Sequence, residues 1–136
     1  MGRILAIDYG QKRTGLAVTD PLRITANPLL TTDTKDLTTW LTDYFAHNEV
    51  DIVVIGHPTQ LNGADSDSMR YIRPFMDHFR KCFPHIPLVE FDERFTSTLA
   101  HRAMIDGGMK KKDRRDKAVV DKIAACIILE DYLTTL

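Results

Sequence analysis

Cysteine is scarce in this chain, which has two among its 136 residues. Cys82 and Cys126 lie far apart, and neither belongs to a C-x-x-C pair. This scarcity excludes a disulfide scaffold and a cysteine-based zinc module, and it fits a reducing compartment. No apolar run approaches the roughly 20 residues that a membrane-spanning helix needs. The amino terminus also lacks the charged start, apolar stretch and cleavage site of a secretion signal, so we expect a cytoplasmic protein with no membrane contact.

An excess of charge of one sign is lacking as well, because the formal net charge is −1. The chain as a whole is therefore not a polycation that binds nucleic acid through bulk charge. Segment 110–117 departs from this balance, since it holds six basic and two acidic residues and carries +4, which leaves −5 on the rest of the chain. Such a segregated cluster is either a contact for a polyanion or a solvated loop.

The remaining composition is that of an ordinary globular domain, with 43% hydrophobic and 27% charged residues. The length is close to the roughly 150 residues of an average domain. No internal repeat, low-complexity tract or linker divides the chain. We therefore expect a single domain over residues 1–136 that is large enough to bury a core.

Short apolar runs bounded by turn residues predict strands. The predicted strands cover residues 3–8, 16–19, 27–32, 51–56 and 88–93. The close spacing of the first two predicts a hairpin, and Pro28 weakens the third.

Apolar residues at helical spacing predict helices between these strands and after them. The predicted helices cover residues 37–45, 72–83, 96–106 and 119–133. Asp33 or Thr34 is the expected N-cap of the first helix, and Pro74 is expected in the first turn of the second or at a kink. The order of elements predicts an α/β fold, a five-stranded mixed sheet flanked by helices, in which an antiparallel hairpin lies beside parallel strands.

Acidic residues fall at the predicted carboxyl ends of strands, where open α/β sheets form their sites. Asp8 ends the first strand, and Asp92 and Glu93 end the fifth. Asp121 opens the last helix and leads a stripe of apolar residues that includes Ala124 and Ala125, so its carboxylate is directed toward the sheet. Each acid taken alone has a structural explanation, such as a strand end, a helix dipole or an ion pair.

Taken together, these acids predict a metal site. Carboxylates that meet in a cleft repel one another, and a divalent cation relieves that repulsion. Ligation by oxygen alone favours Mg²⁺ or Mn²⁺. Two such ions held by carboxylates are the arrangement that hydrolyses phosphodiesters. The turn at 8–15 also has the D-x-G spacing of phosphate-binding hairpins in sugar kinases and chaperone ATPases, but those enzymes clamp a nucleotide between two domains and this chain has only one.

Four motifs in order along the chain carry a resemblance. They are D-Y-G-Q-K-R-T-G at 8–15, G-H-P at 56–58, D-E-R-F-T at 92–96 and V-D-K-I-A-A at 120–125. Together they resemble the YqgF family, the RuvX-like group of Holliday junction resolvases, which is now usually regarded as a group of nucleases that process the 5′ end of the 16S ribosomal RNA precursor. The resemblance covers the whole chain and implies a ribonuclease H-like fold.

The resemblance also implies roles for single residues. Asp8, Glu93 and Asp121 would be the catalytic carboxylates and metal ligands. Adjacent strand residues point to opposite faces, so Asp92 is the alternative to Glu93 rather than a further ligand. His57 stands where members of the family commonly have Leu, and we expect it to be either a half-buried turn residue or a substrate contact.

Basic residues near the acidic site are expected to bind phosphates of the substrate. The candidates are Lys12, Arg13, Arg94, Lys110, Lys111, Lys112, Arg114 and Arg115. No residue identifies itself as a reader of base sequence or of the 2′-hydroxyl.

The leading expectation is a Mg²⁺- or Mn²⁺-dependent nuclease that acts on ribosomal RNA precursor, with ribosomal particles as partners. A Holliday junction resolvase acting on branched DNA is one alternative, and a non-catalytic nucleic-acid-binding module is the other. A resolvase cuts two strands symmetrically and needs a dimer, whereas an RNA-processing nuclease can act as a monomer. We therefore expect a monomer or a weak homodimer.

Overall fold

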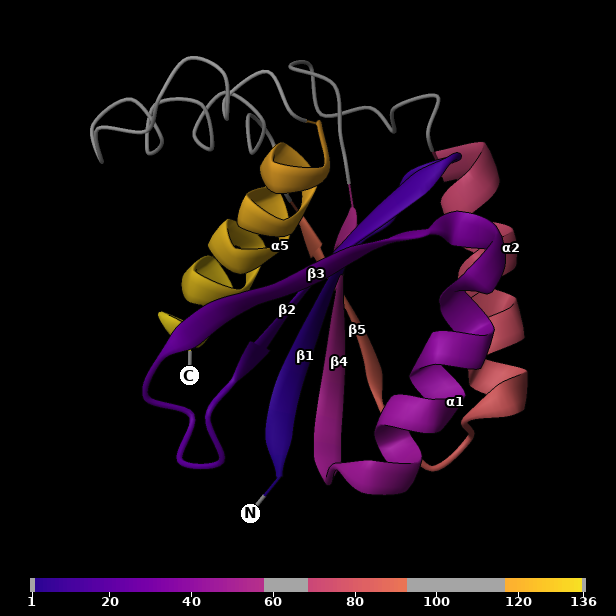
Figure 1. The fold of residues 1–136 in the computed structure, drawn as a ribbon. Helices are drawn as coiled ribbons and strands as arrows, with labels where there is room; N and C mark the ends of the chain where they lie inside the picture. The colour runs from indigo at the N-terminus through magenta and orange to yellow at the C-terminus, as the bar shows by residue number, and fades with distance from the viewer. Residues whose placement is uncertain (1, 58–68, 93–116, 136) are drawn as a thin grey trace.

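The computed structural model describes residues 2–57, 69–92 and 117–135, and these form a five-stranded sheet with helices on both faces (Figure 1). The strands are β1 (Arg3–Asp8), β2 (Arg13–Thr19), β3 (Ala26–Asp33), β4 (Val50–His57) and β5 (Leu88–Asp92). The helices are the short 3₁₀ turn η1 (Thr34–Asp36), followed by α1 (Leu37–His47), α2 (Met69–Cys82) and α5 (Lys117–Leu133).

The sheet has the strand order β3-β2-β1-β4-β5. β1 pairs antiparallel with β2, and β2 pairs antiparallel with β3. On the other side, β1 pairs parallel with β4, and β4 pairs parallel with β5. This confirms the predicted mixed sheet, an antiparallel section beside parallel strands, which is also the arrangement that a ribonuclease H-like fold implies.

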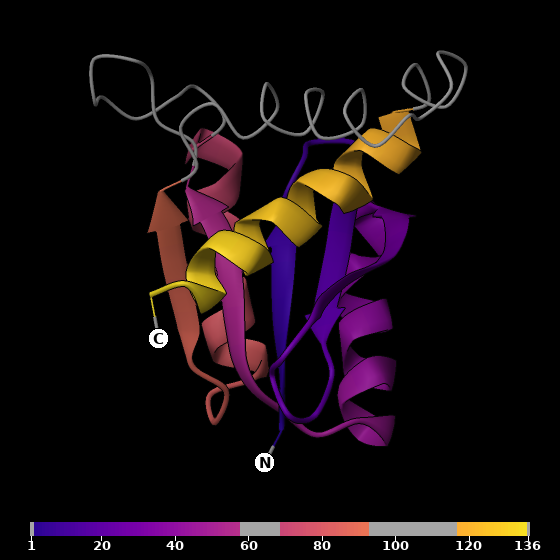
Figure 2. The same ribbon diagram turned by 90° about the vertical axis from the view of Figure 1, so that its left-hand side faces the viewer.

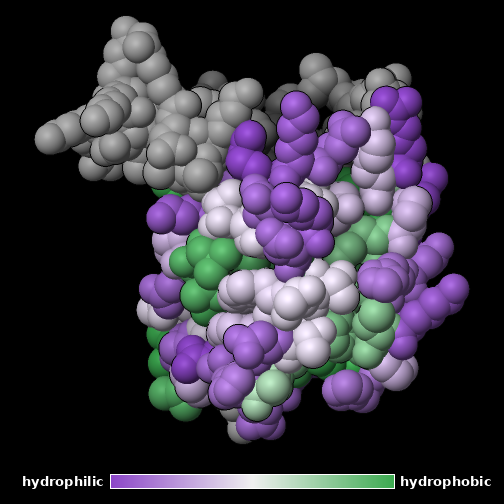
Figure 3. Space-filling view, turned by 45° about the vertical axis from the view of Figure 1, so that its right-hand side comes forward, coloured by the Kyte–Doolittle hydropathy of each residue, from purple (hydrophilic) through white to green (hydrophobic). Residues whose placement is uncertain are grey.

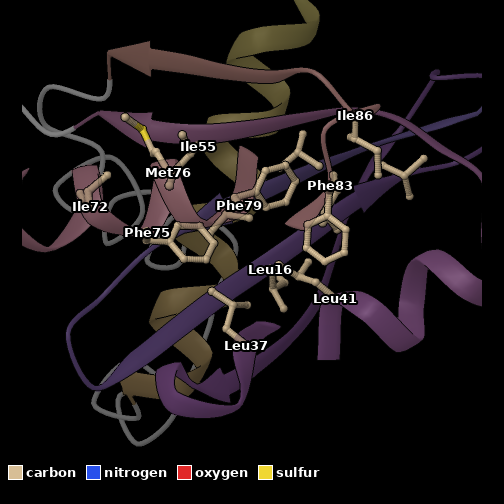
Figure 4. Packing of buried hydrophobic residues seen from close by; sticks show 14 of the residues in the cluster. Leu16, Leu37, Leu41, Ile55, Ile72, Phe75, Met76, Phe79, Phe83 and Ile86 are labelled. Carbon is tan, nitrogen blue, oxygen red and sulfur yellow. The ribbon is translucent and has the colours of Figure 1, made fainter. Parts of the chain in front are cut away.

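The larger part of the core lies between the sheet and helices α1 and α2. Alternate residues of β1, such as Leu5 and Ile7, point to this face and pack against Leu37, Leu41 and the apolar side of α2. Figure 4 shows the α2 side of this cluster, where Phe75 and Phe79 point toward the sheet. Hydrophilic side chains cover much of the outer surface around these helices (Figure 3).

The other face of the sheet is covered by α5 alone within the described residues, and this helix runs diagonally across the strands (Figure 2). Ile4 and Ala6 of β1 point to this face, where they pack in a cluster with Ala125 and Leu129 of α5. The stripe predicted for the last helix is therefore the face that it buries. The two faces of β1 are both apolar, as expected for a central strand with helices on either side.

The strand boundaries differ from the predicted ones most clearly in the hairpin. β2 begins at Arg13, three residues before the expected start, because the polar residues 13–15 pair with β3 and, through Gly15, with Asp8. Pro28 lies within β3, but β3 is an edge strand, and the β2–β3 register shifts next to it, between Leu16 and Ala17. A proline is tolerated at an edge because it interrupts the ladder on one side only.

The side-chain caps expected for the first helix are wrong, and so is the first-turn position of Pro74, whereas the alternative of a kink at Pro74 stays a prediction. Neither Asp33 nor Thr34 caps a helix through its side chain, because the chain enters α1 through η1 and the Thr34 hydroxyl is bonded elsewhere. Pro74 lies inside α2, past the first turn, because that helix begins at Met69, earlier than the apolar spacing predicted. The predicted helix 96–106 lies outside the described residues.

Both cysteines are free, Cys82 at the surface and Cys126 in the core. This agrees with the prediction that no disulfide holds the fold. Within the parts of the chain that the structure describes, no helix combines the length and the apolar character needed to cross a membrane.

Candidate active site

The carboxyl ends of the three parallel strands and the first turns of α5 lie at the same edge of the sheet (Figures 1 and 2). Asp8 is the last residue of β1, and Asp121 is in the second turn of α5. The predicted convergence of these two acids is therefore found in the structure.

Gly15 explains how the two acids come together. Its Cα is the partner of the Asp8 Cα in the antiparallel pairing of β1 and β2. A Cβ atom added to Gly15 would overlap the backbone carbonyl of Asp121. Glycine thus lets the backbone of α5 lie directly on β2, beside the end of β1. Ala124 and Ala125 are buried on the following turn of the helix, so small residues continue this close approach.

The surroundings of Asp8 disfavour its charged form. Burial, followed by the negative charge of Asp121, raises the pKa of Asp8 from 3.8 to about 7. A carboxyl with such a pKa holds a proton at mildly acidic pH unless a cation takes its place. Groups with strongly shifted pKa values occur at functional sites more often than elsewhere, and this supports the assignment of the functional site to this edge of the sheet.

Asp121 has a partner that the sequence does not predict. The Arg13 Nε donates a hydrogen bond to Asp121 Oδ2 at 3.1 Å, and the two side chains keep 38% and 25% of their surface exposed. From the sequence, Arg13 is expected to contact substrate phosphates. In the structure its guanidinium instead faces one of the two carboxylates of the site.

A small hydroxyl network holds the turn that carries Lys12 and Arg13. The Thr34 hydroxyl donates to the Gly10 carbonyl at 2.6 Å and lies 2.8 Å from the hydroxyl of Thr14, which is fully buried. The Thr34 backbone N–H donates to the Lys12 carbonyl at 3.0 Å. The turn is thus tied to η1 from two sides, which places the start of β2 firmly next to Asp8.

Tyr9 packs against the core cluster on the side of the sheet that α1 and α2 cover. Its ring stacks on Phe75 of α2, with the ring centroids 4.7 Å apart, and burial raises the pKa of its hydroxyl. The ring is therefore engaged in packing with α2, which is the usual role of a tyrosine that follows a strand.

The other predicted site residues are placed only in part. Lys12 is exposed on the turn beside Arg13. The side chains of His57 and Asp92 lie outside the described part of the structure, and so do Glu93, Arg94, Lys110, Lys111, Lys112, Arg114 and Arg115. Among the described residues, Asp8 and Asp121 form a pair, and no group of three or more acidic, histidine or cysteine side chains suited to a metal is found there.

This pair fits a hard divalent cation. Carboxylate oxygens are the donors that Mg²⁺ and Mn²⁺ prefer, and both side chains keep access to the same edge of the sheet. A cation between them would offset the burial and repulsion that raise the pKa of Asp8. The donor chemistry of the described residues therefore suits the expected metal.

Comparison with known proteins finds a family that matches almost the whole chain. Residues 2–135 match the RuvX family, described as Holliday junction resolvase. Proteins named "Putative pre-16S rRNA nuclease" are similar along almost their whole length. The one from Phocaeicola vulgatus is 55% identical over 98% of this chain and 96% of its own. The one from Porphyromonas gingivalis is 52% identical over 98% of this chain and 96% of its own.

Among solved structures, YeaZ from Pseudomonas aeruginosa superposes with a TM-score of 0.45 at 18% identity, over 79% of this chain and 50% of its own.

Proposed function

This chain belongs to the RuvX family, and on that premise we propose that it is a metal-dependent nuclease that processes the 5′ end of the 16S ribosomal RNA precursor. The reaction class is hydrolysis of phosphodiester bonds. The observation that carries the proposal is the pairing of Asp8 with Asp121 at the carboxyl edge of the parallel strands, which gives the family assignment a site for its chemistry.

Asp8, Asp121 and Glu93 are the proposed metal ligands. Bound Mg²⁺ or Mn²⁺ would supply an activated water and stabilise the leaving oxygen of the phosphodiester. The protein's own part is to fix Asp8 at the end of a buried strand and to hold Asp121 against it through Gly15, while the bound cation would favour the ionised form of Asp8.

Glu93 is preferred to Asp92 as the third carboxylate on the basis of strand alternation. Phe91 packs in the apolar cluster on the α5 face of the sheet, the face toward which Asp8 and Gly15 also point. Side chains on one face of a strand recur every two residues. Glu93 is two positions after Phe91 in the sequence, and this spacing supports it as the residue that shares a face with Asp8.

Substrate binding is proposed for the basic residues around this edge. Lys12 is exposed on the turn beside the acids. Arg94 and the basic residues of 110–115 would add further phosphate contacts from the neighbouring segments of the sequence. Such contacts position a nucleic-acid backbone without reading its bases, so selectivity would come from the shape of the RNA and from the ribosomal particles that present it.

We propose that the protein performs this role in the cytoplasm, where ribosomes are assembled. A monomer is sufficient for cleavage of this kind.

The decisive experiment compares two substrates under the same conditions. The purified protein is incubated with a small-subunit ribosomal RNA precursor and with a four-way DNA junction, in Mn²⁺ or Mg²⁺ and in chelator. We expect metal-dependent cuts in the precursor and their loss in Asp8→Asn. Asp43→Asn is the matched control, because Asp43 is an exposed acid on α1.

Each other outcome points to a different function. Paired, symmetric cuts in the junction with no cuts in the RNA would reverse the order of the two substrates, as the description of the family as Holliday junction resolvase allows. Binding to either nucleic acid without a metal-dependent cut would favour a non-catalytic binding module. Full activity of Asp8→Asn would contradict the assignment of the site.

A further inference from the structure

The contact between Arg13 and Asp121 joins two groups that the proposed function uses for different purposes. Arg13 begins β2, and Asp121 lies in α5, 108 residues later in the sequence. The bond is a direct one from Nε to Oδ2 at 3.1 Å, and it leaves more than a third of the arginine side chain exposed. An arginine held by its Nε keeps its two terminal nitrogens as further donors.

A divalent cation on Asp121 and the Arg13 guanidinium compete for the same negative charge. Two positive groups on one carboxylate repel each other, and this repulsion is strong at a partly buried site, where solvent screens it poorly. Asp8 adds only one further negative charge among the described residues of the site. Binding of the cation therefore weakens the hold of Asp121 on Arg13.

From this geometry we infer that Arg13 is an exchangeable counter-ion: it neutralises Asp121 in the metal-free protein, is displaced by the divalent cation, and then binds a phosphate of the substrate. This inference rests on the proposed metal site, and it assigns Arg13 a positioning role there. A guanidinium suits both partners, because its planar set of donors matches carboxylate and phosphate alike.

The turn that carries Arg13 favours such an exchange. The backbone of the turn is fixed by the bonds of Thr34 to Gly10 and to Lys12, so the displaced guanidinium stays at the edge of the sheet. Only the side chain has to move. The conformational entropy lost when the ion pair forms in the metal-free protein is also small, because the backbone of the turn is already fixed.

The first test measures metal binding without nucleic acid. Mn²⁺ is titrated into the wild type, Arg13→Gln and Lys12→Gln by calorimetry. Removing a partly exposed ion-pair partner is expected to tighten Mn²⁺ binding by up to about fivefold. Lys12→Gln removes the same charge from the neighbouring exposed position and is expected to change the affinity much less. Arg13→Lys, which keeps the charge but lacks the Nε donor, is expected to lie between Arg13→Gln and the wild type.

Whether Arg13→Gln binds Mn²⁺ more tightly or more weakly than the wild type distinguishes an exchangeable counter-ion from a residue with a purely structural role. If Arg13 only held α5 in place, Arg13→Gln would bind Mn²⁺ more weakly, because Asp121 would be less well positioned. Thermal melting of each variant in chelator shows that it is folded before the titration is interpreted. Weaker binding, or equal changes in Arg13→Gln and Lys12→Gln, would overturn the exchange.

The second test measures the other half of the exchange. Binding of a fluorescent single-stranded RNA is followed by stopped-flow anisotropy, before cleavage, at several salt concentrations with Mn²⁺ and with chelator. Arg13→Gln is expected to lower the slope of log affinity on log salt by about 0.7 in Mn²⁺, the value for one phosphate on a single strand, and to leave it unchanged in chelator. An equal decrease in both conditions would show that Arg13 reaches phosphate without being displaced from Asp121.

Failure of the exchange and failure of the proposed function give different results. A wild type that binds Mn²⁺ but cuts no nucleic acid, together with tighter Mn²⁺ binding by Arg13→Gln, would retain the exchange and reject the nuclease. A wild type that cuts RNA in Mn²⁺ while Arg13→Gln and Lys12→Gln change affinity alike would retain the nuclease and reject the exchange. A wild type that binds no divalent cation would reject both.

Discussion

Gly15 lies so close to the backbone carbonyl of Asp121 that a methyl group on the glycine would overlap it. Because Gly15 is also the cross-strand partner of Asp8, one contact between a strand and a helix sets the distance between the two acids. The geometry of the site thus depends on a residue that has no side chain and takes no part in the chemistry.

Gly15→Ala is expected to damage the fold and the site together. The added methyl group has to push α5 away from β2, and overpacking of this kind costs about 1–3 kcal/mol of unfolding free energy. The shift also separates Asp121 from Asp8, so Mn²⁺ affinity falls. Urea unfolding and Mn²⁺ calorimetry on the same sample check both effects. Wild-type stability and wild-type metal affinity in this variant would contradict the described contact.

The stability of the metal-free protein is expected to fall as pH rises from about 4 to about 7. The folded state raises the pKa of Asp8 to about 7 from its ordinary value of 3.8, so the folded protein binds more protons than the unfolded chain in that window. Once Asp8 is fully ionised in the folded protein, the unfolding free energy lost through this proton linkage is on the order of 4 kcal/mol. Asp8→Asn removes the group, so its stability should depend less on pH.

Urea unfolding in chelator, below and above this window, measures the effect. Asp8→Asn should be the more stable protein at the upper pH, because the wild type then carries an ionised, partly desolvated carboxylate there. Asp43→Asn, at an exposed position of α1, is the control and should follow the wild type. An identical pH dependence in the wild type and Asp8→Asn would show that Asp8 does not titrate in this range.

Addition of Mn²⁺ is expected to reverse that destabilisation. A ligand that binds only the folded state stabilises it in proportion to the logarithm of its concentration over Kd, by about 2.7 kcal/mol at one hundred times Kd. The melting temperature of the wild type near pH 8 should therefore rise with Mn²⁺ and return in excess chelator. Asp8→Asn should show a much smaller rise, and an equal rise in both proteins would place the cation elsewhere.

Neutralising the basic segment is expected to weaken binding to nucleic acid broadly across sequences. Replacing Lys110, Lys111, Lys112, Arg114 and Arg115 by Gln should lower the slope of log affinity on log salt by roughly 0.7 to 0.9 for each phosphate that the segment no longer neutralises. Lys35→Gln and Lys81→Gln, at exposed positions of η1 and α2, are the controls, because they show the change in slope for each charge removed elsewhere on the surface. An unchanged slope in the neutralised protein would identify the segment as solvated surface.

The strands and the buried face of α5 are predictable from the sequence because their signals are local. A short apolar run bounded by turn residues, such as residues 3–8, is typical of a central strand, and the acid that ends such a strand falls at the edge of the sheet. The stripe that Asp121 leads repeats at helical spacing, so its direction toward the sheet follows from periodicity alone.

The contacts of the site are not predictable in the same way, because they join distant parts of the chain. Nothing near Arg13 indicates that its partner is Asp121 rather than a phosphate, since the two lie 108 residues apart. Gly15 resembles an ordinary turn residue until α5 is placed on it. Thr34 is expected to cap a helix, yet its hydroxyl binds Gly10, and only the folded hairpin brings that carbonyl within reach.

The proline in β3 also bears on how copies of the chain can associate. β3 is the outer strand on one side of the described sheet, and an open strand edge invites the edge of another molecule to pair with it. Pro28 lies in this strand and has no N–H to donate, and a proline in an edge strand is one of the features that discourage pairing with another molecule. We therefore expect a two-fold assembly able to cut two strands of a junction symmetrically to use a surface other than this edge.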